Sequence, residues 1–134
     1  MDLSARELDS ALAIEIERVD DPGTKAVMES LNQKRRAARP LTNAIKDLGL
    51  AFLTAKPGEL KELIEDFPEF CKSCQESGAK KANDIIEAIV DRYAAKDYDI
   101  DCDTLTFIGI HLNKQNFRDD ATRCWRRAEE IIST

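Results

Sequence analysis

The chain has 134 residues, enough for one domain with a core of its own or for two small ones. Charged residues make up 34% of it and apolar residues 43%, with four prolines and five glycines, which suits a helix-rich protein better than a sheet protein or a disordered tail. The formal net charge of −6 argues against a general nucleic-acid binder, because a phosphate backbone selects a surplus of Lys and Arg, but it leaves a local basic patch open.

The sequence shows no membrane or secretory segment. It has no run of 18 apolar residues, and its first ten residues, MDLSARELDS, are acidic where a secretory signal would have a basic start and an apolar core. We therefore expect a cytoplasmic protein with no membrane partner.

A first helix is predicted to begin at Ser4, because Ser4 and Glu7 have the spacing of a capping box. One stripe of this helix is apolar and consists of Leu8, Leu12, Ile16 and Val19. Residues 20–23, Asp-Asp-Pro-Gly, end it, and Thr24 is expected to cap a second helix that Pro40 stops. Residues 1–39 are therefore a candidate N-terminal helical arm.

The second helix carries the sharpest charge feature of the chain, a basic cluster of Lys34, Arg35, Arg36 and Arg39. One interpretation is a contact with an anion, either a phosphate backbone or the acidic tail of a partner. The other is a set of cations at a helix C-terminus, where the helix dipole favours them. The basic cluster is the candidate partner-binding site of the sequence.

Residues 42–54 predict a third helix, and residues 57–67 a short fourth one after a Pro-Gly break. Their apolar positions are Ile45, Leu48, Gly49 and Phe52 on the third helix and Leu60, Leu63, Ile64 and Phe67 on the fourth. The pair therefore resembles a helical hairpin.

Pro68 is expected to open a helix that Ser77 and Gly78 close with a C-terminal glycine cap. Within it, Cys71 and Cys74 have the CxxC spacing of a zinc knuckle or a redox pair. A zinc knuckle sits on a tight turn and a thioredoxin-like pair follows a strand, whereas these residues lie on a predicted helix. Buried thiols acting as small hydrophobes are the interpretation we favour for all four cysteines, which include Cys102 and Cys124.

The clearest amphipathic helix spans residues 79–95, where apolar residues recur every three or four positions. That stripe serves either the chain's own core or the seam of a homodimer. The linker that follows has Asp97, Asp99, Asp101 and Asp103 at alternate positions, as in part of a calcium loop. It lacks the glycine and the twelfth-position glutamate of such a loop, so we favour an acidic start of the next helix, capped by Asp103 or Thr104.

Residues 104–132 predict two helices folded against each other across a polar turn at 113–116. The first helix carries Leu105, Ile108, Gly109 and Leu112 on one stripe, and the second carries Ala121, Trp125 and Ala128. Gly109 and Ala121 are small enough to let the helix axes approach. Asn116 is expected to cap the second helix, and Trp125 to lie in the core rather than stack on a base.

These positions and intervals resemble the tetratricopeptide repeat, over about one fifth of the chain. Leu112 stands where the repeat has an aromatic residue, and the aromatic of the turn is displaced by one position to Phe117. Residues 45–67 repeat the first-helix intervals and resemble a second unit. The resemblance implies stacked antiparallel hairpins that bind a partner protein or peptide in a groove between helices, as an adaptor, chaperone or assembly subunit.

Catalytic signatures are absent from the sequence, which has no Gly-rich phosphate loop, no G-x-S-x-G elbow and no HExxH. His111, the only histidine, lies on an apolar helix and is expected in the core. The remaining helix surface at Arg118, Arg123, Arg126 and Arg127 is interleaved with acids and predicts a solvated face.

We therefore predict a single α-helical domain over residues 1–134. Its fold is expected to be all-α, with six or seven helices in stacked antiparallel hairpins or an irregular bundle. The predicted function is a noncatalytic protein-interaction module with no cofactor and no metal. The alternative is a small nucleic-acid-associated regulator that uses the basic cluster, and a homodimer is left open.

Overall fold

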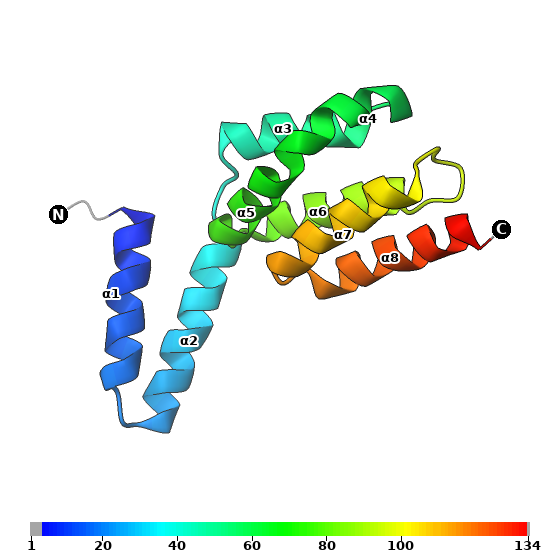
Figure 1. Cartoon of the computed structure of the whole chain (residues 1–134). Helices are drawn as coiled ribbons and strands as arrows, with labels where there is room; N and C mark the ends of the chain where they lie inside the picture. The colour runs from blue at the N-terminus through cyan, green and yellow to red at the C-terminus, as the bar shows by residue number, and fades with distance from the viewer. Residues whose placement is uncertain (1–3, 134) are drawn as a thin grey trace. The chain divides into compact units, whose positions relative to one another are not determined.

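A computed structural model describes residues 4–133 of the chain and is helical throughout its regular elements (Figure 1). In chain order these are α1 (Ala5–Arg18), α2 (Pro22–Ala37), α3 (Asn43–Thr54), α4 (Pro57–Leu63), the 3-10 turn η1 (Ile64–Asp66), α5 (Phe67–Ser77), α6 (Lys80–Tyr93), α7 (Cys102–Lys114) and α8 (Arg118–Ile132). Because α4, η1 and α5 follow one another without a gap, residues 4–133 hold seven unbroken helical runs. The all-α prediction is confirmed.

The chain divides into two compact units, Met1–Arg39 and Pro40–Thr134. The first contains α1 and α2, and the second contains α3 to α8. Within residues 4–133, no helix combines the length with the apolar character that crossing a bilayer requires.

The first unit is a helical hairpin whose two helices begin with side-chain caps. The hydroxyl of Ser4 accepts a hydrogen bond from the backbone N–H of Glu7 at 3.1 Å, as the capping-box spacing predicts. The cap of α2 is Asp21, whose carboxylate accepts from the N–H of Thr24 at 3.1 Å. The expectation that Thr24 itself caps α2 was wrong, because Pro22 occupies the first helical position, where no N–H is needed.

This hairpin has no core of its own among its described residues. The side chains between α1 and α2, such as Leu12, Ile16 and Met28, are only half-buried, and none in residues 4–39 with a described side chain is fully buried. A two-helix hairpin of this size hides too little apolar surface to be strongly stable by itself.

The second unit has a continuous apolar core built around aromatic side chains. The ring of Phe52 on α3 lies 5.3 Å from the rings of both Phe67 and Phe70, which come from α5. The hydroxyl of Tyr93 donates a hydrogen bond to the carbonyl of Phe52, which satisfies the one polar atom that this aromatic residue brings into the core. α3, α5 and α6 are thereby held together.

Helix α6 supplies the central stripe of that core. Of the six residues in the predicted amphipathic stripe, Ile85 is half-buried and the other five are fully buried, namely Ala82, Ile86, Ile89, Val90 and Tyr93. The apolar stripe of α6 therefore serves the chain's own core rather than the seam of a homodimer. The helix before it ends as predicted, because Gly78 takes the left-handed conformation, with φ of 64°, and its N–H donates to the carbonyl of Cys74 at 3.3 Å.

The predicted hairpin at the C-terminus is present, with α7 and α8 antiparallel and side by side (Figure 1). Gly109 is buried in α7, and the indole of Trp125 on α8 lies directly against it. Ala121 is buried as well. The small residues therefore lie in the contact region between the two helices. The side chain that packs into the space beside Gly109 is Trp125.

Several details of the α7–α8 hairpin differ from the expectations. Trp125 is 36% exposed, so its indole is only partly covered and does not lie in the core. Asn116 does not cap α8, which begins after Phe117. With a φ of 66°, Asn116 makes the left-handed turn between the helices, a conformation that Asn tolerates better than most residues. α7 starts at Cys102, before either cap expected for it.

Arg118 and Arg126 of α8 are exposed, as predicted for a solvated face, but Arg123 and Arg127 make specific contacts. Arg123 forms ion pairs with Asp91 of α6 and, at 3.8 Å, with Asp120 of its own helix. Arg127 donates to the carbonyl of Lys96 at 3.3 Å. These contacts attach α8 to α6 and to the segment after it.

Candidate functional site

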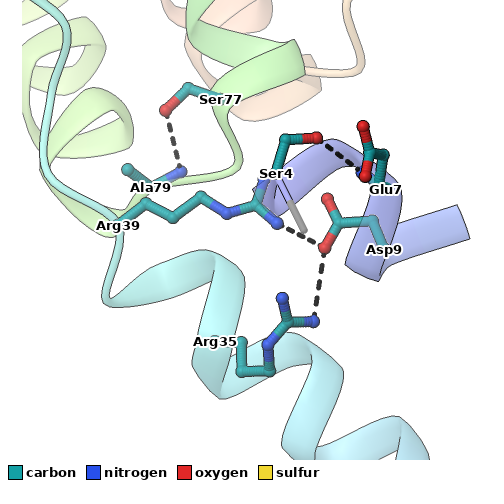
Figure 2. Close-up of polar contacts among 7 residues, drawn as sticks. All are labelled: Ser4, Glu7, Asp9, Arg35, Arg39, Ser77 and Ala79. Atoms are coloured by element: carbon teal, nitrogen blue, oxygen red, sulfur yellow. Dashed lines mark hydrogen bonds and ion pairs between the residues drawn. The ribbon is translucent and has the colours of Figure 1, made fainter. Parts of the chain in front are cut away.

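The basic cluster lies at the end of the α1–α2 hairpin opposite the turn, which we call the open end. There the guanidinium groups of Arg35 and Arg39 converge on the carboxylate of Asp9 from α1 (Figure 2). The distance from Arg35 Nη1 to Asp9 Oδ1 is 3.4 Å. The hydrogen bond from Arg39, helped by the nearby charges of Arg35 and Arg36, holds the pKa of Asp9 below its ordinary value.

Asp9 gives two members of the basic cluster a partner inside the hairpin. Lys34 is exposed, and Arg36 is half-buried, with an Nε atom that has no hydrogen-bond partner among the described residues. A phosphate or an acidic peptide would therefore have to compete with Asp9 for Arg35 and Arg39. Binding of an anionic partner by the basic cluster stays a prediction.

Sequence reasoning missed Asp9, because it lies 26 and 30 residues before its two partners. The signal available was an acid on the same stripe as Leu12 and Ile16, where an apolar residue would be expected. Such a residue on the inner side of a helix indicates a charged partner on the facing helix.

A groove that the sequence reasoning also missed runs between the end of α3 and α4, with a volume of about 450 Å³. It is lined by Ala51, Thr54, Ala55, Glu59, Glu62, Leu63 and Asp66. The apolar members, Ala51, Ala55 and Leu63, are half-buried or buried, and the three acids are exposed. The result is an apolar floor with an acidic rim, which we call the α3–α4 groove.

The acidic rim follows from helical spacing. Glu59, Glu62 and Asp66 are three and four residues apart, so they share one face of the α4–η1 run. That periodicity was visible in the sequence. The apolar floor was not, because Ala51 and Ala55 come from another helix.

The wall of the groove is held by contacts to the last turn of α3. The carbonyl of Ala55, just beyond α3, accepts hydrogen bonds from Arg92 at 2.7 Å and from the hydroxyl of Tyr98 at 3.1 Å. The guanidinium of Arg92 also lies over the Tyr98 ring, 5.1 Å from its centre. A cation at a helix C-terminus is favoured by the dipole, so this arrangement stabilises the end of α3.

The segment with alternating aspartates connects α6 to α7. Asp97, Asp99 and Asp101 are exposed, while Tyr98 and Ile100 between them pack toward the core. Among residues 4–133 there is no group of three acidic, cysteine or histidine side chains placed to hold a metal ion. A second hollow, of about 380 Å³, lies between this segment and the start of α4, lined by Asp99, Ile100 and Lys61 among others.

Cys71, Cys74 and Cys124 are fully buried, in agreement with thiols that act as small hydrophobes, while Cys102 is only half-buried. Burial raises the pKa of Cys74 and of Cys124 to about 12, and it raises the pKa of Cys71 as well. Since the thiolate is the reactive and metal-binding form, burial suppresses both chemistries at these positions.

His111 is half-buried rather than in the core, with its ring 4.5 Å from that of Phe107. Burial, together with the charge of Lys114, lowers the pKa of His111 below its ordinary value. The side chain is therefore neutral at pH 7 and packs as an aromatic ring.

Comparisons with known proteins give no relative, since no family model, curated protein or solved structure matches this chain. The candidate sites consequently rest on the described residues alone. Of the two, the α3–α4 groove combines an open volume with a defined chemistry, while the basic cluster is engaged by Asp9.

Proposed function

We propose that the protein is a noncatalytic protein-interaction module that takes a partner peptide or helix in the α3–α4 groove. The observation that supports this is the groove's composition, with the apolar side chains of Ala51, Ala55 and Leu63 beneath three exposed carboxylates. Apolar floors bounded by polar rims are the usual build of peptide-binding surfaces. Adaptor, chaperone and assembly subunit are the roles that fit such a module.

The volume and charge of the α3–α4 groove indicate what kind of partner it would bind. A volume of about 450 Å³ accommodates one or two side chains of a partner. The rim of Glu59, Glu62 and Asp66 favours a Lys or Arg beside the side chain that enters. The expected ligand is therefore a short helix or extended segment with a small apolar anchor and a neighbouring cation.

The similarity of residues 104–132 to a tetratricopeptide unit supports the same class of function. This support comes from the sequence pattern of residues 104–132. The α3–α4 groove lies in residues 45–67, the segment that resembles a second such unit. In both cases the partner would lie between two helices.

The test is recovery of partners from lysate by the intact chain and by a charge-reversal variant, Glu59→Lys with Glu62→Lys. The control is Glu76→Lys with Glu129→Lys, which changes two exposed glutamates elsewhere and alters the net charge equally. We expect a partner that is retained by the control and lost by the groove variant. Equal recovery by both variants, or no reproducible partner, would argue against the proposed function.

A further inference from the structure

The outer surface of the α1–α2 hairpin carries large apolar side chains that nothing in the first unit covers. Leu8, Val27 and Leu31 are all exposed, with Leu31 at 51%. The same unit has no buried residue among those with described side chains, so none of its apolar side chains is fully covered. Exposed apolar surface of this kind marks an interface.

These side chains gather on one broad side of the hairpin. The inner stripe of α1 is marked by Asp9, Leu12 and Ile16, and that of α2 by Met28, Asn32 and Arg35. At 100° per residue, Leu8 and Ala11 on α1, and Val27 and Leu31 on α2, lie roughly 70–130° round from the centres of these stripes in the same rotational sense. Because α1 and α2 are antiparallel, equal rotations bring all four to one side, which we call the apolar side.

The other broad side of the hairpin is polar. Rotation by a similar angle in the opposite sense reaches Ser10 and Glu17 on α1, and Glu29 and Gln33 on α2. The hairpin is therefore amphipathic as a unit, although each helix taken alone shows only a diffuse pattern. A hairpin with one apolar side is half of a four-helix bundle.

The charges of the hairpin are separated along its length. The four cations of the basic cluster lie at the open end, against Glu7 and Asp9. At the turn end the balance is reversed, because Glu15, Glu17, Asp20 and Asp21 stand against Arg18 and Lys25. The hairpin is thus positive at one end and negative at the other.

We propose that the apolar side pairs with the apolar side of a second copy of this chain, with the two hairpins antiparallel in a four-helix bundle. The separation of charge along the hairpin favours a second copy as the partner. In an antiparallel pair, the basic open end of each hairpin lies over the acidic turn end of the other. A parallel copy would place like charges together. The pairing involves the first unit alone and is independent of the α3–α4 groove.

The antiparallel arrangement predicts which residue of the second copy Leu31 contacts. This residue lies near the middle of α2, which spans Pro22–Ala37, and it sits on the apolar side. In an antiparallel pair related by a two-fold axis, the middle of each hairpin meets the middle of the other. Leu31 therefore faces Leu31 of the second copy.

The experiment measures the mass of the full chain by light scattering and sedimentation over a range of concentrations. We expect a species of twice the chain mass of 15.1 kDa. Val27→Glu with Leu31→Glu should raise the dimer dissociation constant by at least about tenfold, because it buries carboxylates in an apolar seam. Ile14→Glu is the control, since Ile14 is 56% exposed, points away from α2 and lies roughly 100° round α1 from the apolar side.

Orientation is tested by oxidation of Leu31→Cys in a Cys102→Ser background, which removes the one half-buried native thiol. This variant should give a disulfide-linked dimer when Ile14→Cys in the same background does not. Added salt should weaken the dimer, whereas a dimer strengthened by salt would contradict the antiparallel arrangement. A chain that stays monomeric would overturn the proposal, as would a dimer unaffected by Val27→Glu with Leu31→Glu. A monomer whose unfolding midpoint falls in that variant but not in Ile14→Glu would show that the chain covers the apolar side itself.

Discussion

The contact between Gly109 and Trp125 shows how one residue sets the spacing of two helices. A Cβ atom added to Gly109 would lie 2.2 Å from Nε1 of the indole, well inside van der Waals contact. The same Nε1–H donates to the carbonyl of Thr106 at 3.3 Å, so the ring is positioned by a hydrogen bond as well as by packing. The lack of a side chain at residue 109 is what lets the indole of Trp125 lie against α7.

Gly109→Ala should therefore destabilise the protein. The methyl group would displace the indole, and we expect the free energy of unfolding to fall by about 1–2 kcal/mol, the overpacking cost less the helix-propensity gain of Ala. Urea unfolding followed by Trp fluorescence measures it. Gly58→Ala is the control, because no atom lies within 4 Å of a Cβ there, and it should leave stability unchanged or raise it. A Gly109→Ala variant as stable as the wild type would contradict the contact.

The thiols give a second prediction at the residue scale. Because burial raises the pKa of Cys74 and Cys124 to about 12, an alkylating reagent at pH 8 should modify Cys102 first and the three buried thiols only on unfolding. Mass spectrometry of the alkylated chain counts the adducts. Cys102→Ser should remove the fast phase, and rapid modification of Cys71 or Cys74 in the native protein would contradict their burial.

At the scale of elements, the α1–α2 hairpin depends on ionic contacts as much as on apolar ones. Its inner side chains are only half-buried, and Asp9 holds Arg35 and Arg39 at the open end. The second unit is built differently, because its helices share a core in which Phe52, Phe67 and Tyr93 are fully buried. Removal of one charge should therefore lower the stability of the hairpin without affecting the second unit.

Asp9→Asn should loosen the open end of the hairpin. The two ion pairs are partly exposed, so we expect a loss of about 0.5–1 kcal/mol, seen as faster amide exchange in α1 and α2 and not in the second unit. Glu17→Gln, which removes an exposed acid without such a partner, is the control. Unchanged exchange in Asp9→Asn would show that the pairs contribute nothing.

The same contact predicts a dependence on pH. The folded-state pKa of Asp9 lies below its ordinary value of 3.8, so the stabilisation is fully present above the unfolded-state pKa and is lost as the pH falls through the folded one. The protection factors of the hairpin amides, which are their exchange rates relative to the intrinsic rates at the same pH, should therefore fall in the wild type below about pH 4. In Asp9→Asn this fall should be smaller.

For the whole molecule, the uneven distribution of burial is the main feature. All core residues described as buried lie between Ile45 and Ala128, inside the second unit. A cooperative unfolding transition is expected of a unit that has such a buried core. The two units should therefore differ in their thermal behaviour.

A chain of residues 40–134 should fold alone, with a melting temperature within about 5 °C of the full chain, a shift that corresponds to roughly 1 kcal/mol. A chain of residues 1–39 should be mostly unfolded at low concentration, because two helices without a buried residue are marginal. Circular dichroism on heating compares them. A 40–134 chain that fails to melt cooperatively would contradict this division.

The parts of the fold that the sequence predicted are those that depend on neighbours along the chain. The Ser4 cap, the Gly78 cap and the amphipathic stripe of α6 each follow from spacings of three or four residues. Where two local signals competed, as Asp21 and Thr24 did for the cap of α2, sequence reasoning chose the wrong one.

By itself, the sequence determined that this chain is helical and where most of its helices begin and end, because capping and amphipathic periodicity act within one or two turns. Only the tertiary structure decided which residues meet. Arg39 lies 30 residues from Asp9, and Tyr98 lies 43 residues from the Ala55 carbonyl that it binds. The apolar floor and acidic rim of the α3–α4 groove likewise come from different elements, and their contact depends on how helices pack, which no local spacing encodes.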